Sequence, residues 1–82
     1  MTDTALLARL RADTPGCLTR VHLNNAGSAL PPQVVVDTMV DHLRREAEIG
    51  GYEAHAEAGA RIDAVYSSLG RLVGAPASSI AL

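Results

Sequence analysis

Two short glycine-containing segments hold the residues of this chain that are best suited to receive a ligand. The first lies within VHLNNAGSALPP, residues 21–32, where Asn25, Ala26 and Gly27 form a polar turn. Asparagine tolerates left-handed backbone and glycine permits close approach, so the backbone N–H groups of such a turn are able to face a ligand. The alternative is a plain connection whose asparagines bond to nearby backbone groups, and the pattern alone favours this alternative.

The second segment is Gly51, Tyr52 and Glu53, which follows Gly50. It has two interpretations. The segment is either a flexible loop that presents Tyr52 and Glu53 to a pocket, or the end of one helix and a hinge to the next. Because paired glycines commonly end helices, the pattern alone favours the second interpretation.

No other group of residues forms a convincing chemical site. His55 has Glu53 and Glu57 nearby, but residues two apart lie on different helix faces, and one histidine is too few for a metal site. Cys17 has no identified base to activate it, and none of the serines has the context of a nucleophile elbow. The residues alone therefore predict neither a catalytic set nor a metal site.

The composition predicts that this chain does not bury a sufficient core alone. Its 82 residues are 48% apolar, yet they include two tyrosines and neither Phe nor Trp. Aromatic side chains dominate the cores of small domains, and a domain without them usually needs a disulfide, a metal or a partner. Because Cys17 is the sole cysteine, no internal disulfide is possible. We therefore expect an oligomer or a part of a larger protein.

The charge pattern gives no argument for nucleic acid or an anionic membrane as a partner. The net charge is −2, and all seven basic residues are arginine. The first residues resemble no signal peptide, and no apolar run approaches the length of a membrane span. We expect a cytoplasmic protein.

The periodicity of apolar residues predicts a mainly α-helical segment. Two helices carry apolar stripes, one formed by Val36, Met39, Val40, Leu43 and Ala47, the other by Ala58, Ile62, Val65, Leu69 and Leu72. The final residues, SSIAL, are typical of the start of a strand, and we expect the complete protein to continue this strand. The predicted elements are a short helix capped by Thr2 or Asp3, a turn at 13–16, a short strand at 20–23, a helix from about 31 to 48, a helix from about 52 to 73 ended by Gly74 and Pro76, and the strand start at 78–82.

The order of three motifs resembles the N-terminal region of class V aminotransferase-fold enzymes. The motifs are VHLNNAGSALPP, LRREAEIGGYEA and RLVGAPASSIAL, and the resemblance covers nearly the whole chain from Val21 onward. This family of pyridoxal-phosphate proteins includes cysteine desulfurases, selenocysteine lyases and isopenicillin N epimerase-like proteins. Each motif alone is weak, whereas the ordered set with its spacings is fairly specific.

The resemblance implies an α/β fold and an active site for the complete protein. It implies that Asn25, Ala26 and Gly27 help to receive the substrate, and that Gly51, Tyr52 and Glu53 lie near the active site at a homodimer interface. It also implies pyridoxal 5'-phosphate as cofactor, an amino acid as substrate, and transamination, desulfuration or elimination, or epimerisation as the reaction. Residues 1–30 would form the N-terminal helix, strand and substrate-side loop, residues 31–73 two helices, and residues 74–82 the start of the cofactor-binding domain.

The chain differs from the family in one respect that bears on its activity: it has no lysine. Family members hold the cofactor through a lysine, and this chain contains no lysine. We therefore expect an N-terminal fragment that is inactive by itself and binds no cofactor covalently. The alternative is a small helical module that dimerises through residues 53–73. A helix-turn-helix DNA-binding domain is disfavoured, because the helix after Gly51 carries more acidic than basic residues.

Overall fold

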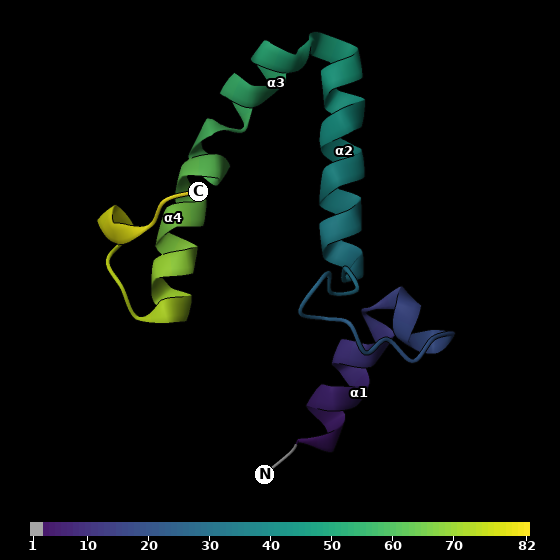
Figure 1. Ribbon diagram of the computed structural model, residues 1–82. Helices are drawn as coiled ribbons and strands as arrows, with labels where there is room; N and C mark the ends of the chain where they lie inside the picture. The colour runs from purple at the N-terminus through teal and green to yellow at the C-terminus, as the bar shows by residue number, and fades with distance from the viewer. Residues whose placement is uncertain (1–2) are drawn as a thin grey trace. The chain divides into compact units, whose positions relative to one another are not determined.

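Helices account for most of the chain in the computed structural model, which describes residues 3–82 (Figure 1). The chain divides into two compact units, Met1–Leu43 and Arg44–Leu82, and each unit is described here by itself. The prediction of a mainly helical segment is confirmed. The α-helices are α1 (Thr4–Ala12), α2 (Gln33–Ile49), α3 (Gly51–Glu57) and α4 (Gly59–Val73), and the 3-10 helices are η1 (Pro15–Leu18) and η2 (Ala77–Ser79).

The first unit begins with α1, whose start is fixed by a side-chain cap. The Asp3 carboxylate accepts hydrogen bonds from the backbone N–H groups of Ala5 and Leu6, at 3.0 and 3.1 Å. This confirms one of the two predicted caps; the other, Thr2, lies outside the described residues. Such a cap satisfies N–H groups that have no partner inside the helix. At the other end, the helix stops at Ala12, immediately before the predicted turn.

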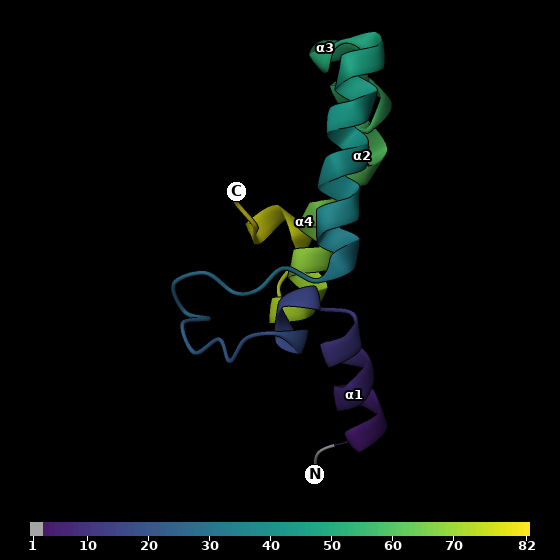
Figure 2. The ribbon, with the colours of Figure 1, turned by 90° about the vertical axis from the view of Figure 1, so that its right-hand side faces the viewer.

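The second half of the predicted turn at 13–16 belongs to a 3-10 helix, η1, which begins at Pro15 and continues to Leu18. The backbone N–H of Gln33 donates to the carbonyl oxygen of Asp13 at 2.7 Å, so the first residue of α2 is tied to the end of the α1 segment. The Leu30 side chain lies close to Gly16. These two contacts hold the ends of the loop of residues 19–32 close together. Figure 2 shows this loop extending away from η1 and α2.

Neither predicted strand is present among residues 3–82. Residues 20–23 are irregular, and the side chains of Val21 and Leu23 are 88% and 89% exposed. At the other position, η2 occupies part of the predicted strand start, and Ile80 follows in extended backbone, with φ −95° and ψ 129°. The physical reason is that a strand needs a neighbour to accept its backbone hydrogen bonds. No second strand is available in the described part of the chain.

The second unit contains the end of α2 followed by α3 and α4. We predicted one helix from about 52 to 73, and the structure has two helices that meet at Ala58. Ala58 has φ −84° and ψ 0°, which departs from helical geometry, and Gly59 follows it. Glycine is unfavourable inside a helix because it loses the most backbone freedom on folding. Interrupting the helix beside Gly59 therefore costs little free energy.

The end of α4 is closed by a glycine in left-handed backbone. Gly74 has φ 74° and ψ 33°, and the backbone N–H of Ala75 donates to the carbonyl oxygen of Gly70 at 2.9 Å. This geometry satisfies helix carbonyl groups that lack partners. It also turns the chain back, so that η2 packs on α4 at Gly70. The predicted helix end at Gly74 is confirmed.

Very few residues are buried. Within the described residues only Ala54, Ala58 and Gly70 are buried, and the apolar residues of the two predicted stripes are mostly exposed. Met39 and Leu43 of α2 are 63% and 62% exposed. The helices therefore have the predicted amphipathic pattern, but the described chain covers little of their apolar faces. No helix among residues 3–82 is both long enough and apolar enough to span a membrane.

A methyl group at Gly70 should destabilise the second unit. A Cβ there would lie 2.5 Å from the carbonyl oxygen of Ala75 and 3.3 Å from the backbone nitrogen of Ala77. We expect Gly70→Ala to cost about 1–3 kcal/mol through overpacking. A thermal unfolding series followed by far-ultraviolet circular dichroism measures the effect.

Gly59→Ala is the matched control, since a Cβ at Gly59 has no atom within 4 Å. This variant should be neutral or more stable by up to about 1 kcal/mol. Equal stabilisation of the helices by both substitutions would show that η2 does not pack on Gly70.

Candidate functional site

Local hydrogen bonds fix the polar turn at residues 24–28. The side-chain oxygen of Asn24 accepts from the backbone N–H of Gly27 at 3.3 Å, and the Asn24 carbonyl oxygen accepts from the N–H of Ser28 at 3.1 Å. The Asn25 side-chain amide donates to the carbonyl oxygen of His22 at 3.3 Å. Both asparagines therefore bind nearby backbone groups, as in the plain-connection alternative.

Fewer backbone N–H groups of this turn are available to a ligand than the sequence predicts. The N–H of Gly27 already has an acceptor in Asn24, and Gly27 does not adopt positive φ. Within the described residues, the backbone N–H groups of Asn25 and Ala26 have no hydrogen-bond acceptor. If this turn receives a ligand through its backbone, the available donors are therefore those of Asn25 and Ala26.

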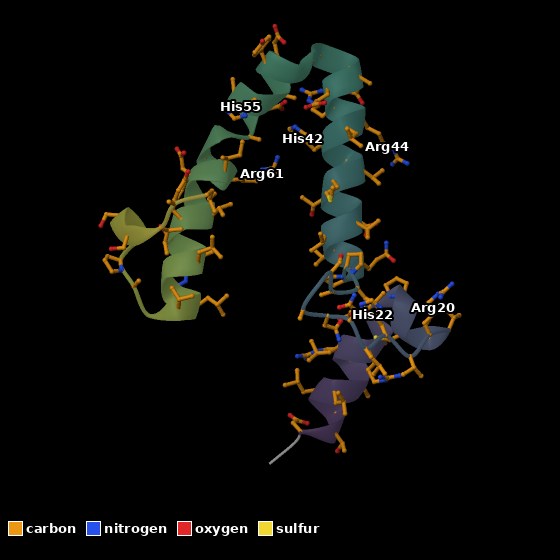
Figure 3. The ribbon with its side chains drawn as sticks, in the orientation of Figure 1. Arg20, His22, His42, Arg44, His55 and Arg61 are labelled. Atoms are coloured by element: carbon orange, nitrogen blue, oxygen red, sulfur yellow. The ribbon has the colours of Figure 1, made fainter. Side chains whose placement is uncertain are left out.

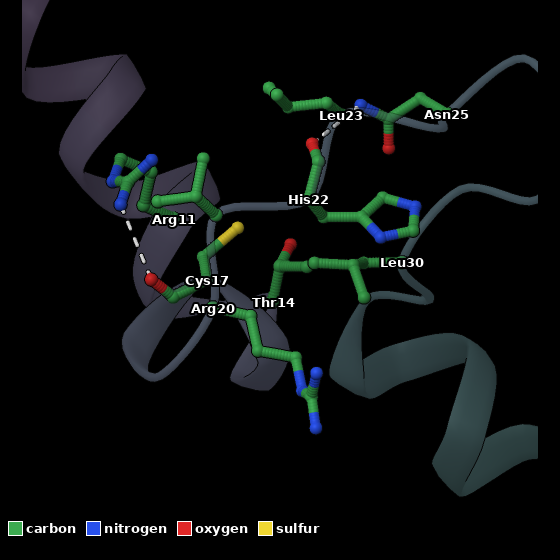
Figure 4. A pocket seen from close by; sticks show the side chains of 9 residues that line it. Arg11, Thr14, Cys17, Arg20, His22, Leu23, Asn25 and Leu30 are labelled. Carbon is green, nitrogen blue, oxygen red and sulfur yellow. Dashed lines mark hydrogen bonds between the residues drawn. The ribbon is translucent and has the colours of Figure 1, made fainter.

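A pocket of about 400 Å³ lies beside this turn in the first unit. Figure 4 shows the side chains that line it: the Arg11 guanidinium lies beside the backbone of Cys17, the His22 ring lies near Leu30, and the Arg20 side chain extends in a third direction. Arg11 donates from Nη2 to the carbonyl oxygen of Cys17 at 3.3 Å. The thiol of Cys17 is unpaired with another cysteine and half-buried. No sequence pattern groups these residues, because they come from α1, η1 and the following loop.

The second predicted segment begins at a strained glycine. Gly50 has φ 100° and ψ 153°, a combination that is essentially restricted to glycine. The backbone N–H of Gly50 donates to the Glu46 carbonyl oxygen at 2.8 Å, which is the last hydrogen bond of α2. The Gly50 carbonyl oxygen accepts from the N–H of Ala54 at 3.0 Å, which is the first hydrogen bond of α3. One residue thus ends α2 and starts α3. The helix end predicted at this glycine pair is present, and a new helix begins directly after it.

The three predicted residues of this segment form the first turn of α3. Gly51 begins the helix, Tyr52 is 92% exposed, and Glu53 is also exposed. A tyrosine this exposed has neither its ring packed nor its hydroxyl enclosed, although both are usual for tyrosine in a folded site. The segment therefore presents Tyr52 outward and does not itself enclose a pocket.

An arginine clamp, formed by Arg45, Glu48 and Glu57, spans the connection between α2 and α3. Nε and Nη2 of Arg45 donate to the two carboxylate oxygens of Glu57 at 2.7 and 3.1 Å, a bidentate arrangement. Nη1 donates to Glu48 at 3.1 Å. Bidentate pairs are directional as well as attractive, so this clamp ties the end of α3 to the last turns of α2 within the second unit. No sequence pattern indicates this clamp, because residues twelve apart give no periodic signal.

The clamp shifts the pKa values of its members. Hydrogen bonds from Arg45 lower the pKa of the Glu57 carboxyl below that of an ordinary glutamate, and the charges of Arg45 and Arg61 add to this effect. Correspondingly, the bonds to Glu57 and Glu48 raise the pKa of Arg45. Because these groups are solvent-exposed, the clamp contributes little to stability.

The predicted site residues belong to different units. Asn25, Ala26 and Gly27 lie in the first unit, and Gly51, Tyr52 and Glu53 lie in the second. His55 lies on α3, as Figure 3 shows. No group of three or more metal-ligating side chains occurs among residues 3–82.

Replacing Gly50 should disrupt the connection between α2 and α3. We expect Gly50→Ala to destabilise the second unit by about 1–3 kcal/mol, because its backbone conformation is nearly exclusive to glycine. The added methyl would also meet the Glu53 carboxylate. Thermal unfolding followed by circular dichroism at several concentrations measures the loss.

The neighbouring Gly51→Ala provides the control. Gly51 has no positive φ, and the nearest atom to an added Cβ, a Glu46 carboxylate oxygen, is 4.0 Å away. This variant should unfold at the same temperature as the parent or slightly above it. A loss at Gly51 as large as that at Gly50 would contradict the assigned backbone geometry.

The clamp should make stability depend on pH through Glu57. Because the pKa of Glu57 is lower in the folded than in the unfolded chain, the contribution is present above the unfolded pKa and is lost as pH falls through the folded pKa. Arg45→Gln should raise the Glu57 pKa toward that of a free glutamate, as measured by the side-chain carboxyl carbon in an NMR titration. Arg61→Gln should raise it less. An unchanged pKa in the Arg45 variant would show that the clamp does not form in solution.

Comparison with known proteins found one similarity to a curated protein that bears on this chain. No family model matches the chain, and no solved structure matches it. Over 76 residues the chain is 33% identical to a protein of Mycobacterium tuberculosis (strain CDC 1551 / Oshkosh) named "Probable hercynylcysteine sulfoxide lyase". The aligned region covers 93% of this chain but 19% of that relative. The chain thus spans about a fifth of the length of the relative it matches.

Proposed function

We propose that this chain is the N-terminal segment of a longer pyridoxal-phosphate-dependent enzyme of the class V aminotransferase fold that acts on an amino acid. The observation that carries the proposal is the 33% identity to a protein named as a lyase, which extends over 93% of the chain. The ordered motifs VHLNNAGSALPP, LRREAEIGGYEA and RLVGAPASSIAL also support this family.

The residues of this chain do not by themselves suit covalent attachment of the cofactor. Pyridoxal phosphate is held in such enzymes as a Schiff base with a lysine amine, and the seven basic residues here are all arginine. A guanidinium stays protonated and is not available as a nucleophile at neutral pH. The cofactor and the chemical steps therefore belong to other parts of the proposed longer protein, and this segment contributes binding surface.

The contribution of the first unit would be substrate binding at the polar turn. Asn25, Ala26 and Gly27 match the family's substrate-side turn, and the unpaired N–H groups of Asn25 and Ala26 suit a carboxylate oxygen. The N–H of Gly27 is not available to a substrate, because it donates to the Asn24 side chain and so stabilises the turn. In this proposal the asparagine bonds shape the turn, and the two remaining donors contact the substrate.

The contribution of the second unit would be an interface. The strongly exposed Tyr52 and the uncovered apolar residues of α2 and α4 suit burial against the remainder of the enzyme and a second subunit. Gly50 and the arginine clamp would hold Gly51, Tyr52 and Glu53 in place for that contact. We propose a cytoplasmic homodimer for the complete protein.

Among the reactions open to the family, we favour a lyase reaction. The relative is named "Probable hercynylcysteine sulfoxide lyase". We therefore place sulfur-containing amino acids first among candidate substrates, ahead of substrates for transamination or epimerisation.

Reading the nucleotide sequence downstream of the Leu82 codon tests the proposal directly. We expect an in-frame continuation that encodes a small-residue phosphate loop and, later, a lysine in an apolar strand context. The protein encoded by the whole frame should release a sulfur-containing product from a cysteine sulfoxide conjugate when supplied with pyridoxal phosphate. A stop codon directly after Leu82 with no such continuation would refute the proposal.

The second candidate function is a helical dimerisation module without catalytic activity. The observation that favours it is the apolar face of α4, on which Val65 and Leu72 are 39% and 79% exposed. Sedimentation of the 82-residue chain separates the candidates when combined with the downstream sequence. A stable dimer together with a stop codon favours the module.

A further inference from the structure

We propose that the pocket beside the polar turn binds a small molecule through an oxyanion, a carboxylate or a phosphate, held chiefly by Arg20 with Arg11. The inference rests on the residues of the first unit and does not depend on the proposed enzyme function. The pocket, of about 400 Å³, lies within the usual size range for small-ligand sites.

The charges around the pocket are of one sign. Arg11 and Arg20 both line it, and none of its lining residues is a carboxylate. Because no acid among the lining residues offsets their charge, these guanidinium groups make the pocket attractive to anions. The chain as a whole carries a net charge of −2, so this concentration of positive charge is local.

The two arginines retain unused donors. Arg11 donates from Nη2 to the Cys17 carbonyl oxygen at 3.3 Å, which anchors its side chain at the pocket wall. Arg20 makes no side-chain hydrogen bond or ion pair within the described residues, so its planar set of donors is available. Figure 3 shows Arg20 and His22 on the segment that follows η1. A guanidinium suits bidentate bonding to carboxylate or phosphate oxygens.

The other walls of the pocket are held in place by local bonds. Nε2 of His22 lies 2.8 Å from the Ser28 carbonyl oxygen, which only accepts, so this nitrogen carries a proton. The Asn25 amide is bonded to the His22 carbonyl, as the dashed line in Figure 4 marks. Leu30 and Cys17 supply an apolar side. Because the pocket has both a cationic and an apolar side, it suits an oxyanion attached to a small organic group more than a free ion.

An NMR titration of the 82-residue chain tests this inference, with inorganic phosphate and acetate as probes at constant ionic strength set by chloride. We expect the side-chain Nε–Hε signal of Arg20 and the backbone signals of residues 20–30 to shift in a saturable manner. Arg20→Gln should weaken the binding about tenfold, which corresponds to the loss of one charge-assisted hydrogen bond.

Arg9→Gln is the matched control, because Arg9 lies on α1 beside the pocket residue Arg11 but does not line the pocket. It removes the same charge and should leave the binding nearly unchanged. Circular dichroism of both variants verifies that helix content is preserved. If Arg20→Gln alters the fold, Arg11→Gln compared with Arg9→Gln takes its place in the same titration.

The two probes identify the chemistry of the ligand. Saturable binding of phosphate alone, of acetate alone or of both supports the inference and assigns the oxyanion. The inference is overturned if neither probe gives saturable shifts, or if Arg9→Gln weakens binding as much as the pocket variant. The second result would indicate general attraction to arginine.

Discussion

Hydrogen bonds between residues close in sequence hold the described elements of this chain, because side-chain burial contributes so little. Only two alanines and one glycine are buried among residues 3–82. The elements therefore begin and end where local bonds specify: at the Asp3 carboxylate, in the turn closed by Asn24, and at the glycine conformations of Gly50 and Gly74. In most small domains burial outweighs such terms.

The uncovered apolar faces connect this local order to the proposed function. Helices with one apolar stripe are most stable when that stripe is packed. The stripe on α2 is largely exposed, whereas on α4 Val65 and Leu72 are exposed and Ile62 and Leu69 are half-buried. The exposed residues are the ones that the proposed function places at an interface. The similarity to a region that makes up 19% of a lyase is in keeping with that explanation.

Different interactions stabilise the two segments predicted as candidate sites. Side-chain amides close the polar turn, which leaves two backbone donors available and places it beside a cationic pocket. The Gly51–Glu53 segment depends instead on one strained glycine and on the arginine clamp at the α2–α3 connection. The first arrangement suits the binding of a small anionic group, and the second suits the fixed presentation of a surface.

Periodicity and residues that act within one helical turn, such as Asp3 and Gly74, were enough to predict α1, α2 and the end of α4. The division of the predicted 52–73 helix into α3 and α4 at Ala58 was not predicted. Tertiary structure alone decided three other features. The predicted strands at 20–23 and 78–82 are absent because a strand depends on a neighbour that sequence periodicity cannot supply. The Arg45–Glu57 pair and the grouping of Arg11 with Arg20 join residues of separate elements. Only the path of the backbone between those elements brings such side chains together.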